Sequence, residues 1–252
     1  MRCMKFRSEL RGSCLALAVA LSLLAAPNAR AASIHYGDFS DIPPGSVTFL
    51  DVTESSITDL LPLYGAPTAI ADSLDFDPMG FGASSVGGVA DITDGQLNFG
   101  LWSETGMSSI SFSEAGDFSL AGSGTAATQT LAGLNVLVDI LEVDGVVLDE
   151  AIQVGGNVTF LADLANDAGV VVPWSLGLVI DLTGALLEQQ VEFRVGVTHA
   201  EVALDNQLLA LSEAGSAAFI AKKDFGVSVP EPSSLLLGVL VLAAVLREGR
   251  RS

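Results

Sequence analysis

Three carboxylates stand close together in the stretch DSLDFD at residues 72–77. Carboxylate oxygens are hard ligands of the kind that calcium takes in proteins. The spacing of Asp72, Asp75 and Asp77 does not follow the D-x-[DN]-x-[DN]-G pattern of an EF-hand loop, so a solvated turn is the competing interpretation. These three side chains are the candidate calcium site, and Ca²⁺ is the single cofactor that the sequence brings forward.

Residues for nucleophilic or zinc chemistry are scarce. The cysteines, Cys3 and Cys14, both lie near the N-terminus, the histidines are His35 and His199, and no H-E-x-x-H or G-x-S-x-G motif occurs. Two carboxylates facing each other across a groove could cleave a glycan. With 27 acidic residues between positions 32 and 229, however, no pair stands out. We therefore predict that the protein is not an enzyme.

The charge of the chain is distributed very unevenly. Between residues 32 and 229 the 27 acidic side chains face three basic ones, Arg194, Lys222 and Lys223, which gives a formal charge of −24. Nucleic acid is excluded as a partner of this segment, because phosphates need basic side chains to neutralise them. A strongly acidic surface keeps an exported protein soluble through self-repulsion.

The N-terminal segment has the three parts of a secretory signal peptide. Basic residues come first, an apolar stretch runs from residue 14 to 26, and the small residues Ala29 and Ala31 mark a cleavage site. Residues 1–31 are therefore predicted to direct export by the Sec route and to be removed. The exported segment then has no cysteine and cannot form a disulfide.

Three unlike features follow one another at the C-terminus. Pro230, Glu231 and Pro232 form an extended segment, because each proline disfavours a helical conformation in the residue before it. Residues 235–246 are apolar, and as a helix they would cover about 18 Å, against about 30 Å for the hydrocarbon core of a membrane. Three basic residues then place this end on the cytoplasmic side of the membrane: Arg247, Arg250 and Arg251.

In this order the three features resemble the PEP-CTERM sorting signal of exported bacterial proteins, and the resemblance is confined to residues 229–251. It implies recognition by an exosortase, a membrane enzyme that cuts near the Pro-Glu-Pro, commonly in Gram-negative bacteria that make exopolysaccharide. Residues 235–246 would hold the protein transiently at the inner membrane before it reaches the cell envelope, cell surface or extracellular matrix. A plain membrane anchor is the alternative. Exopolysaccharide and other surface proteins are the partners that this reading implies.

The segment between the two signals, residues 32–228, has the patterns of a β-rich domain. Residues 191–198 alternate strictly between apolar and other side chains, which predicts a half-buried strand. Asp-Gly at 94–95 and at 144–145, and more weakly Asp-Asn at 205–206, are dipeptides typical of hairpin turns. The fold class is therefore mainly β, an antiparallel β-sandwich or jelly roll with few short helices, flanked by the signal peptide and by a short C-terminal membrane helix.

Several other segments are less clear. Residues 131–143 fit both helical and strand spacing until the turn after them favours a strand. Short helices are compatible with residues 160–166 and 183–190, and the glycine-rich run 80–88 is predicted to be a mobile connection. The tetrapeptide Ser-Glu-Ala-Gly begins at 113 and again at 212, which we interpret as two separate turns of similar chemistry.

Three functions follow in order of preference. The first is a non-catalytic structural or adhesive protein at the cell surface or in the extracellular matrix, sorted and processed by an exosortase. The second is a calcium-dependent carbohydrate-binding module, and the third is a carboxylate-dependent glycan hydrolase or lyase. Chelation should abolish glycan binding only in the second case, and new reducing ends should form only in the third.

Overall fold

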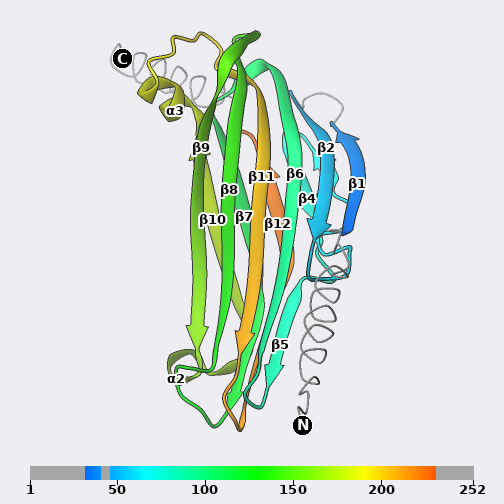
Figure 1. Cartoon of the computed structure of the whole chain (residues 1–252), viewed down its shortest axis with the longest axis vertical. Helices are drawn as coiled ribbons and strands as arrows, with labels where there is room; N and C mark the ends of the chain where they lie inside the picture. Colours follow the sequence, from blue (N-terminus) through cyan, green and yellow to red (C-terminus); the bar gives the residue numbers. More distant parts are fainter. Residues whose placement is uncertain (1–31, 41–45, 231–252) are drawn as a thin grey trace, which may run out of the picture. The chain divides into compact units, whose positions relative to one another are not determined.

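The computed structural model describes residues 32–40 and 46–230. Two antiparallel sheets pack against each other, with sheet A toward the viewer in Figure 1. The prediction of a mainly β protein of the antiparallel sandwich type is confirmed. The predicted signal peptide, with Ala29 and Ala31, and the predicted C-terminal helix lie outside the described residues.

Sheet A has six strands in the spatial order β1-β2-β6-β11-β8-β9, so β1 and β9 are its edges. Sheet B has the order β10-β7-β12-β4-β3, with β5 also paired to β12. The bounds in sheet A are β1 Ala32–Phe39, β2 Val47–Ser56, β6 Ala90–Met107, β8 Gln129–Val143, β9 Val146–Asp163 and β11 Val197–Leu211. The bounds in sheet B are β3 Thr68–Ile70, β4 Ser73–Phe76, β5 Gly82–Val86, β7 Ser109–Gly122, β10 Gly169–Asp181 and β12 Ser216–Ser228. Two short helices, α2 Leu164–Asp167 and α3 Leu182–Glu188, flank β10.

Alternation of side chains divides each strand between the core and the surface. On β6, Leu97, Phe99 and Leu101 are buried between the sheets, while Gln96 and Asn98 point the other way. Successive side chains of a strand point to opposite faces, so this pattern orients the whole strand. Sheet A therefore has one apolar face against sheet B and one polar face toward solvent.

An aromatic cluster fills one part of the core. Tyr64 packs edge-on against Phe76, Phe81 and Phe225, with ring centroids 5.9, 5.1 and 5.3 Å away. All four side chains are fully buried. Burial of a side chain of this size contributes about 1.5–3 kcal/mol, so these contacts attach Tyr64 firmly to strands β4 and β12 of sheet B.

The turn prediction at Asp144-Gly145 is confirmed. It joins β8 to β9, and both residues adopt positive φ angles, 52° and 78°. The turn predictions at Asp94-Gly95 and Asp205-Asn206 are wrong, because these dipeptides lie inside β6 and β11. A Cβ on Gly95 would approach Leu63 to 2.9 Å, so this glycine is required by core packing and not by a turn.

The predicted strand at residues 191–198 is also wrong over most of its length. Strand β11 begins at Val197, and the residues before it form an irregular segment. The Asp144 carboxylate accepts the backbone N–H groups of Arg194, Val195 and Gly196 at 2.7–3.0 Å. The backbone N–H groups of this segment therefore pair with a side chain and not with a neighbouring strand. The same hydrogen bonds lower the pKa of Asp144.

Four further expectations can be compared with the fold. Residues 131–143 lie in strand β8, as predicted, and short helices occur near both expected places. The glycine-rich run 80–88 is not simply a connection, since β5 forms within it and pairs with β12. The segment 113–116 is not a turn, because it lies within β7 with Glu114 facing the core. The segment 212–215 does lie at the β11–β12 turn.

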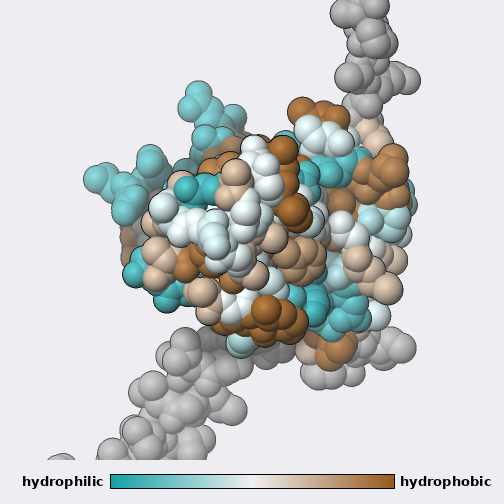
Figure 2. Space-filling view, turned by 90° about the horizontal axis from the view of Figure 1, so that it is seen from below, coloured by the Kyte–Doolittle hydropathy of each residue, from teal (hydrophilic) through white to brown (hydrophobic). Residues whose placement is uncertain are grey.

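The end of the sandwich near α2 has a mixed surface. Seen from below, it shows separate patches of hydrophobic residues among neutral and hydrophilic ones (Figure 2). Hydrophobic side chains that are scattered in this way are normal on protein surfaces. On the broad outer face of sheet A, by contrast, polar side chains of neighbouring strands lie in register.

Candidate functional site

The three predicted calcium ligands have different surroundings. Asp72 is buried, and its Oδ1 accepts the backbone N–H groups of Ser46 and Val47, so it fixes the start of β2. Asp75 and Asp77 are exposed. The pKa of Asp75 is raised, mainly by desolvation and to a smaller extent by the negative charge of Asp77. Within the described part of the chain, no group of three or more His, Cys, Asp or Glu side chains is placed to hold a metal ion. The calcium site stays a prediction.

The predicted sorting residues fall almost entirely beyond the described part. Pro230 is the last described residue and is exposed, directly after β12 and Val229. Glu231 and Pro232 lie outside the described residues, as do Arg247, Arg250 and Arg251. Among the helices of residues 32–40 and 46–230, none is both long and apolar enough to cross a membrane.

Five polar side chains form one row across the outer face of sheet A. Pairing registers place them opposite one another on neighbouring strands, and four of the five are exposed, with the serine half-buried. With strands about 4.8 Å apart, the row extends over roughly 19 Å. We call it the polar row: Ser55 on β2, Gln96 on β6, Asp205 on β11, Asn135 on β8 and Asn157 on β9.

The rows on either side of the polar row are also exposed or half-buried. One contains Asp94, Gln207, Gly133 and Thr159 in register. Farther along the strands lies Trp102, 40% exposed and opposite His199. The outer face thus combines amides, hydroxyls and carboxylates with an aromatic surface near one end.

Asp94 and Asp205 are hydrogen-bonded to each other on this face. Partial burial, this hydrogen bond and the Asp205 charge raise the pKa of Asp94 to about 6, with a further contribution from Asp59. Glycosidases keep their two carboxyl groups about 5 Å or more apart to admit the sugar or a water molecule. Two carboxyl groups in direct hydrogen-bond contact do not have that geometry.

Lysine and arginine are absent from the strands of sheet A in the described part of the chain. The Lys and Arg residues of the described part are Arg194, in the segment before β11, and Lys222 and Lys223, on β12 of sheet B. The carboxylates of the outer face, among them Glu201 and Asp139, therefore have no Lys or Arg of sheet A beside them, although the His199 imidazole lies 3.7 Å from Glu201. This face carries a negative electrostatic potential.

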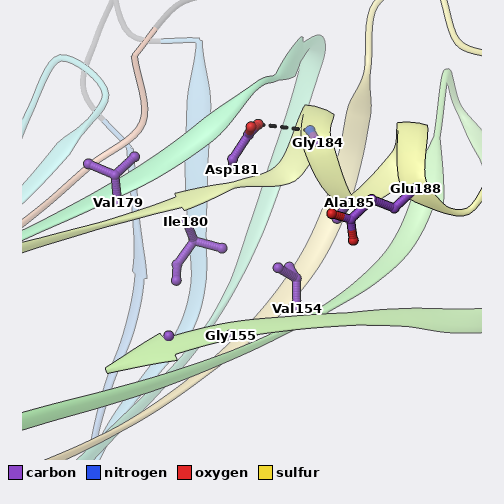
Figure 3. Close-up of a pocket in the computed structure, with 9 residues that line it drawn as sticks. Val154, Gly155, Val179, Ile180, Asp181, Gly184, Ala185 and Glu188 are labelled. Atoms are coloured by element: carbon purple, nitrogen blue, oxygen red, sulfur yellow. Dashed lines mark hydrogen bonds between the residues drawn. The ribbon is translucent and has the colours of Figure 1, made fainter. Parts of the chain in front are cut away.

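A small cavity opens at the edge of the sandwich, between β9, β10 and α3 (Figure 3). Its volume is about 230 Å³, below the range of about 300–1,000 Å³ usual for ligand sites. The Asp181 carboxylate accepts the backbone N–H of Gly184 at 2.8 Å and so caps α3. Val154 and Ile180 point into the gap between the two strands. The lining residues are Val154, Gly155, Gly156, Val179, Ile180, Asp181, Gly184, Ala185 and Glu188.

Comparison with known proteins leaves the family open, since no protein-family model and no curated protein matches the chain. Among solved structures, the chain is similar to TmCBM61 in complex with β-1,4-galactotriose, with 9% identity, 63% of this chain and 70% of that chain covered, and a TM-score of 0.22. It is also similar to CBM28, a carbohydrate-binding module specific for non-crystalline cellulose, with 12% identity, coverage of 65% and 77%, and a TM-score of 0.24. A family 12 xyloglucanase from Bacillus licheniformis gives 11% identity, coverage of 80% and 100%, and a TM-score of 0.22. Likeness at this level carries no argument about function.

The polar row was missed in the sequence because its members are far apart along the chain. Gln96 and Asn135 each stand between apolar residues that alternate with polar ones, as in GQLNFG and GLNVLVD. That alternation marks a strand whose polar side faces water. Which strands lie side by side, and in which register, is not contained in any single segment.

Proposed function

We propose that this protein is an exported, non-catalytic β-sandwich that works at the cell surface or in the extracellular matrix and binds polysaccharide through the outer face of sheet A. The observation that carries this proposal is the polar row. Export and exosortase sorting rest on the two terminal segments of the sequence. The proposal joins the adhesive role with carbohydrate binding and does not depend on calcium.

The chemistry of the polar row suits a chain of sugar hydroxyls. An Asn or Gln side chain offers both a donor and an acceptor in one plane, while a carboxylate is a strong acceptor. Gln96, Asp205 and Asn135 lie on three adjacent strands, so their side chains are regularly spaced. A hydroxyl group donates and accepts as well, and an extended glycan could therefore bond to several strands at once.

Apolar surface next to the polar groups supports the same proposal. Trp102 on β6 and Leu137 on β8 are each 40% exposed on the outer face. An indole ring combines a large apolar surface with one polar N–H group, which suits contact with the C–H face of a sugar. The outer face can thus contact both kinds of surface that a sugar ring presents.

The negative electrostatic potential of the outer face determines which class of glycan it can bind. Asp205, Glu201 and Asp139 would repel an anionic polymer, since no Lys or Arg of sheet A offsets them. The proposed ligand is therefore an uncharged polysaccharide. The proposal of a non-catalytic role rests on the sequence, in which no nucleophile or zinc motif occurs and no pair of carboxylates stands out.

The test is binding of the purified chain to a soluble neutral β-glucan, measured by affinity electrophoresis and calorimetry with calcium and with EDTA. We expect saturable binding in both conditions. Gln96→Ala and Asn135→Ala should each weaken binding roughly 2- to 10-fold, because a hydrogen bond contributes about 0.5–1.5 kcal/mol. Gln189→Ala is the matched control, an exposed amide beyond the end of α3.

Three other results would each favour a different function. Binding lost in EDTA would support the calcium-dependent module and direct attention to Asp72, Asp75 and Asp77. New reducing ends in the glucan would support a hydrolase. No binding to a panel of neutral bacterial and algal polysaccharides would remove the polar row as a glycan site and leave a protein partner.

A further inference from the structure

A lysine is buried at the centre of the sandwich. Lys222 lies on β12 of sheet B, its side chain is 0% exposed, and it points toward sheet A. There its Nζ contacts Oδ1 of Asn206 on β11 and lies 2.5 Å from Oε2 of Glu114 on β7. Asn206 Nδ2 donates to the same Glu114 oxygen at 2.8 Å. Lysine, asparagine and glutamate from three strands thus meet in one buried cluster.

Lys222 faces the core through the regular alternation of β12, in which Ala218, Ile220 and Lys222 are buried. Between Lys222 and Asp224 the register of β12 against β7 shifts, so Lys223 and Asp224 both face solvent and Phe225 faces the core together with Lys222. Gly116 lies opposite this point, and a Cβ there would overlap the carbonyl oxygen of Ala221. The absence of a side chain at position 116 is therefore what lets the two strands approach.

The surroundings of Nζ are aromatic. The ring centroids of Phe81, Phe225 and Tyr64 lie 4.4, 5.0 and 5.2 Å from it. Burial lowers the pKa of Lys222 to about 8, although Glu114 opposes the shift. An amine that is desolvated in this way is a far better nucleophile than a surface ammonium group.

As an ion pair the cluster is costly and incomplete. Glu114 is the one carboxylate that pairs with Lys222, and its Oε1 is buried with no hydrogen-bond partner among the described residues. Removing two charges from water costs several kcal/mol per ion unless the remaining polar atoms are satisfied. A reaction that leaves both groups neutral would remove this cost.

We propose that Lys222 and Asn206 form an intramolecular isopeptide bond that joins β12 of sheet B to β11 of sheet A. In this step an Nζ–Cγ bond forms and the Cγ–Nδ2 bond of Asn206 breaks. Because Nζ contacts Oδ1, and a C=O bond is about 1.23 Å long, the amine is already beside the carbon it attacks. Holding two reacting groups in such a geometry lowers the barrier strongly.

Glu114 moves the protons. It first takes one proton from the Lys222 ammonium, which frees the lone pair of Nζ. It then gives a proton to Nδ2 of Asn206 and receives the second proton of Nζ, as a general acid and base that bonds to both nitrogens. Nδ2 leaves as ammonia, the carboxyl group is left protonated and neutral, and no oxidant, reductant or other reactant takes part.

Mass spectrometry of the purified full chain tests the bond directly. A glutamate-specific protease cuts after Glu201, Glu213 and Glu248 but not after Glu231, which precedes a proline, so Asn206 and Lys222 fall in separate peptides, 202–213 and 214–248. We expect these peptides to remain joined, with a mass lower than their sum by one ammonia molecule. Two separate peptides at their unmodified masses, from folded wild-type protein, would overturn the proposal.

Variants identify the reacting groups. Lys222→Met and Asn206→Ala should abolish the joined peptide, and Glu114→Gln should reduce its yield by more than tenfold after equal incubation. Lys223→Ala is the matched control, since this neighbouring lysine is exposed and paired with Asp117. A joined peptide that persists in Lys222→Met, or that disappears in Lys223→Ala, would refute the assignment of the bond to these residues.

Discussion

Glu54 accepts a hydrogen bond from the backbone N–H of Tyr64 at 3.0 Å, and both side chains are fully buried between the sheets. The same carboxylate accepts the backbone N–H groups of Leu63 and Gly65 and, at 2.6 Å, the hydroxyl of Tyr36. One side chain thus holds the loop that delivers Tyr64 to the aromatic cluster. The loop and the core are therefore formed together.

Replacing this carboxylate should be severe for stability. Glu54→Ala leaves several buried donors without an acceptor, and each can cost about 1–3 kcal/mol. We expect the free energy of unfolding to fall by about 3–5 kcal/mol, measured by urea denaturation. Glu150→Ala, at an exposed position of β9, is the control. A loss below about 1 kcal/mol for Glu54→Ala would contradict this role.

Asp94 should make stability depend on pH. Its folded pKa of about 6 lies above the ordinary value of 3.8, so the folded state binds more protons between these values. Stability contributed by this group is therefore present at low pH and lost as pH rises through about 6. Asp94→Asn should exceed wild type in stability at pH 8, and the difference should shrink toward pH 4. Thermal unfolding across this range, with Asp149→Asn as control, checks the sign.

Charge on the outer face should select among glycans. Because Asp205, Glu201 and Asp139 lie on this face with no Lys or Arg of sheet A beside them, alginate should bind far more weakly than a neutral glucan. Added salt should narrow the difference by screening the repulsion. Asp205→Asn should raise affinity for alginate, while Asp224→Asn, on sheet B, should not. Affinity electrophoresis in gels containing each polymer measures both effects, and equal retardation in the two gels would argue against the proposed electrostatics.

The isopeptide bond should restrict the unfolded chain. A cross-link that closes a loop of about 15 residues contributes about 3 kcal/mol, and positions 206 and 222 define a loop of similar length. Asn206→Ala should therefore unfold at lower urea concentration and with a larger m-value, because its unfolded state exposes more surface. Asn98→Ala, a half-buried amide on the outer face, is the control. An unchanged m-value would be evidence that the unfolded wild-type chain carries no link.

The sorting proposal has its own test in cells. Changing Pro230 and Pro232 together to alanine removes the residues that keep the segment before the apolar stretch extended. We expect a larger species retained in the inner membrane of a host that contains an exosortase. Normal release of the double variant would refute the assignment. Glu248→Ala, in the basic tail, should leave processing unchanged.

The sequence predicted the fold class well and the interior poorly. Asp144-Gly145 was recognised because its chemistry is local, as a two-residue turn with positive φ angles between paired strands. Asp94-Gly95 and Asp205-Asn206 have similar composition but lie within long strands. Gly95 leaves space for the side chain of Leu63, and the amide of Asn206 donates to Glu114. In both cases the partner is distant in the sequence, so a local pattern does not reveal the contact.

Lys222 shows the same difficulty more sharply. From the sequence, Lys222 is one of three basic residues between positions 32 and 229, and its neighbour Lys223 suggests a pair of exposed charged side chains. Alternation from Ala218 through Ile220 does place it on the buried side of β12, which is the one local signal of its position. The partners that make it chemically interesting lie on β7 and β11, and only the folded structure brings them together.

Asp205 and Asn206 are neighbours on β11, one pointing out to the polar row and the other in toward Lys222. A protein held by its C-terminal end and pulled by a glycan on sheet A would carry tension from Pro230 along β12, across the Lys222–Asn206 amide, and directly to Asp205. The load would follow a covalent path through the middle of the sandwich and would not have to be borne by the hydrogen bonds between strands. A cysteine-free domain would in this way gain mechanical strength that does not depend on the redox state of its surroundings.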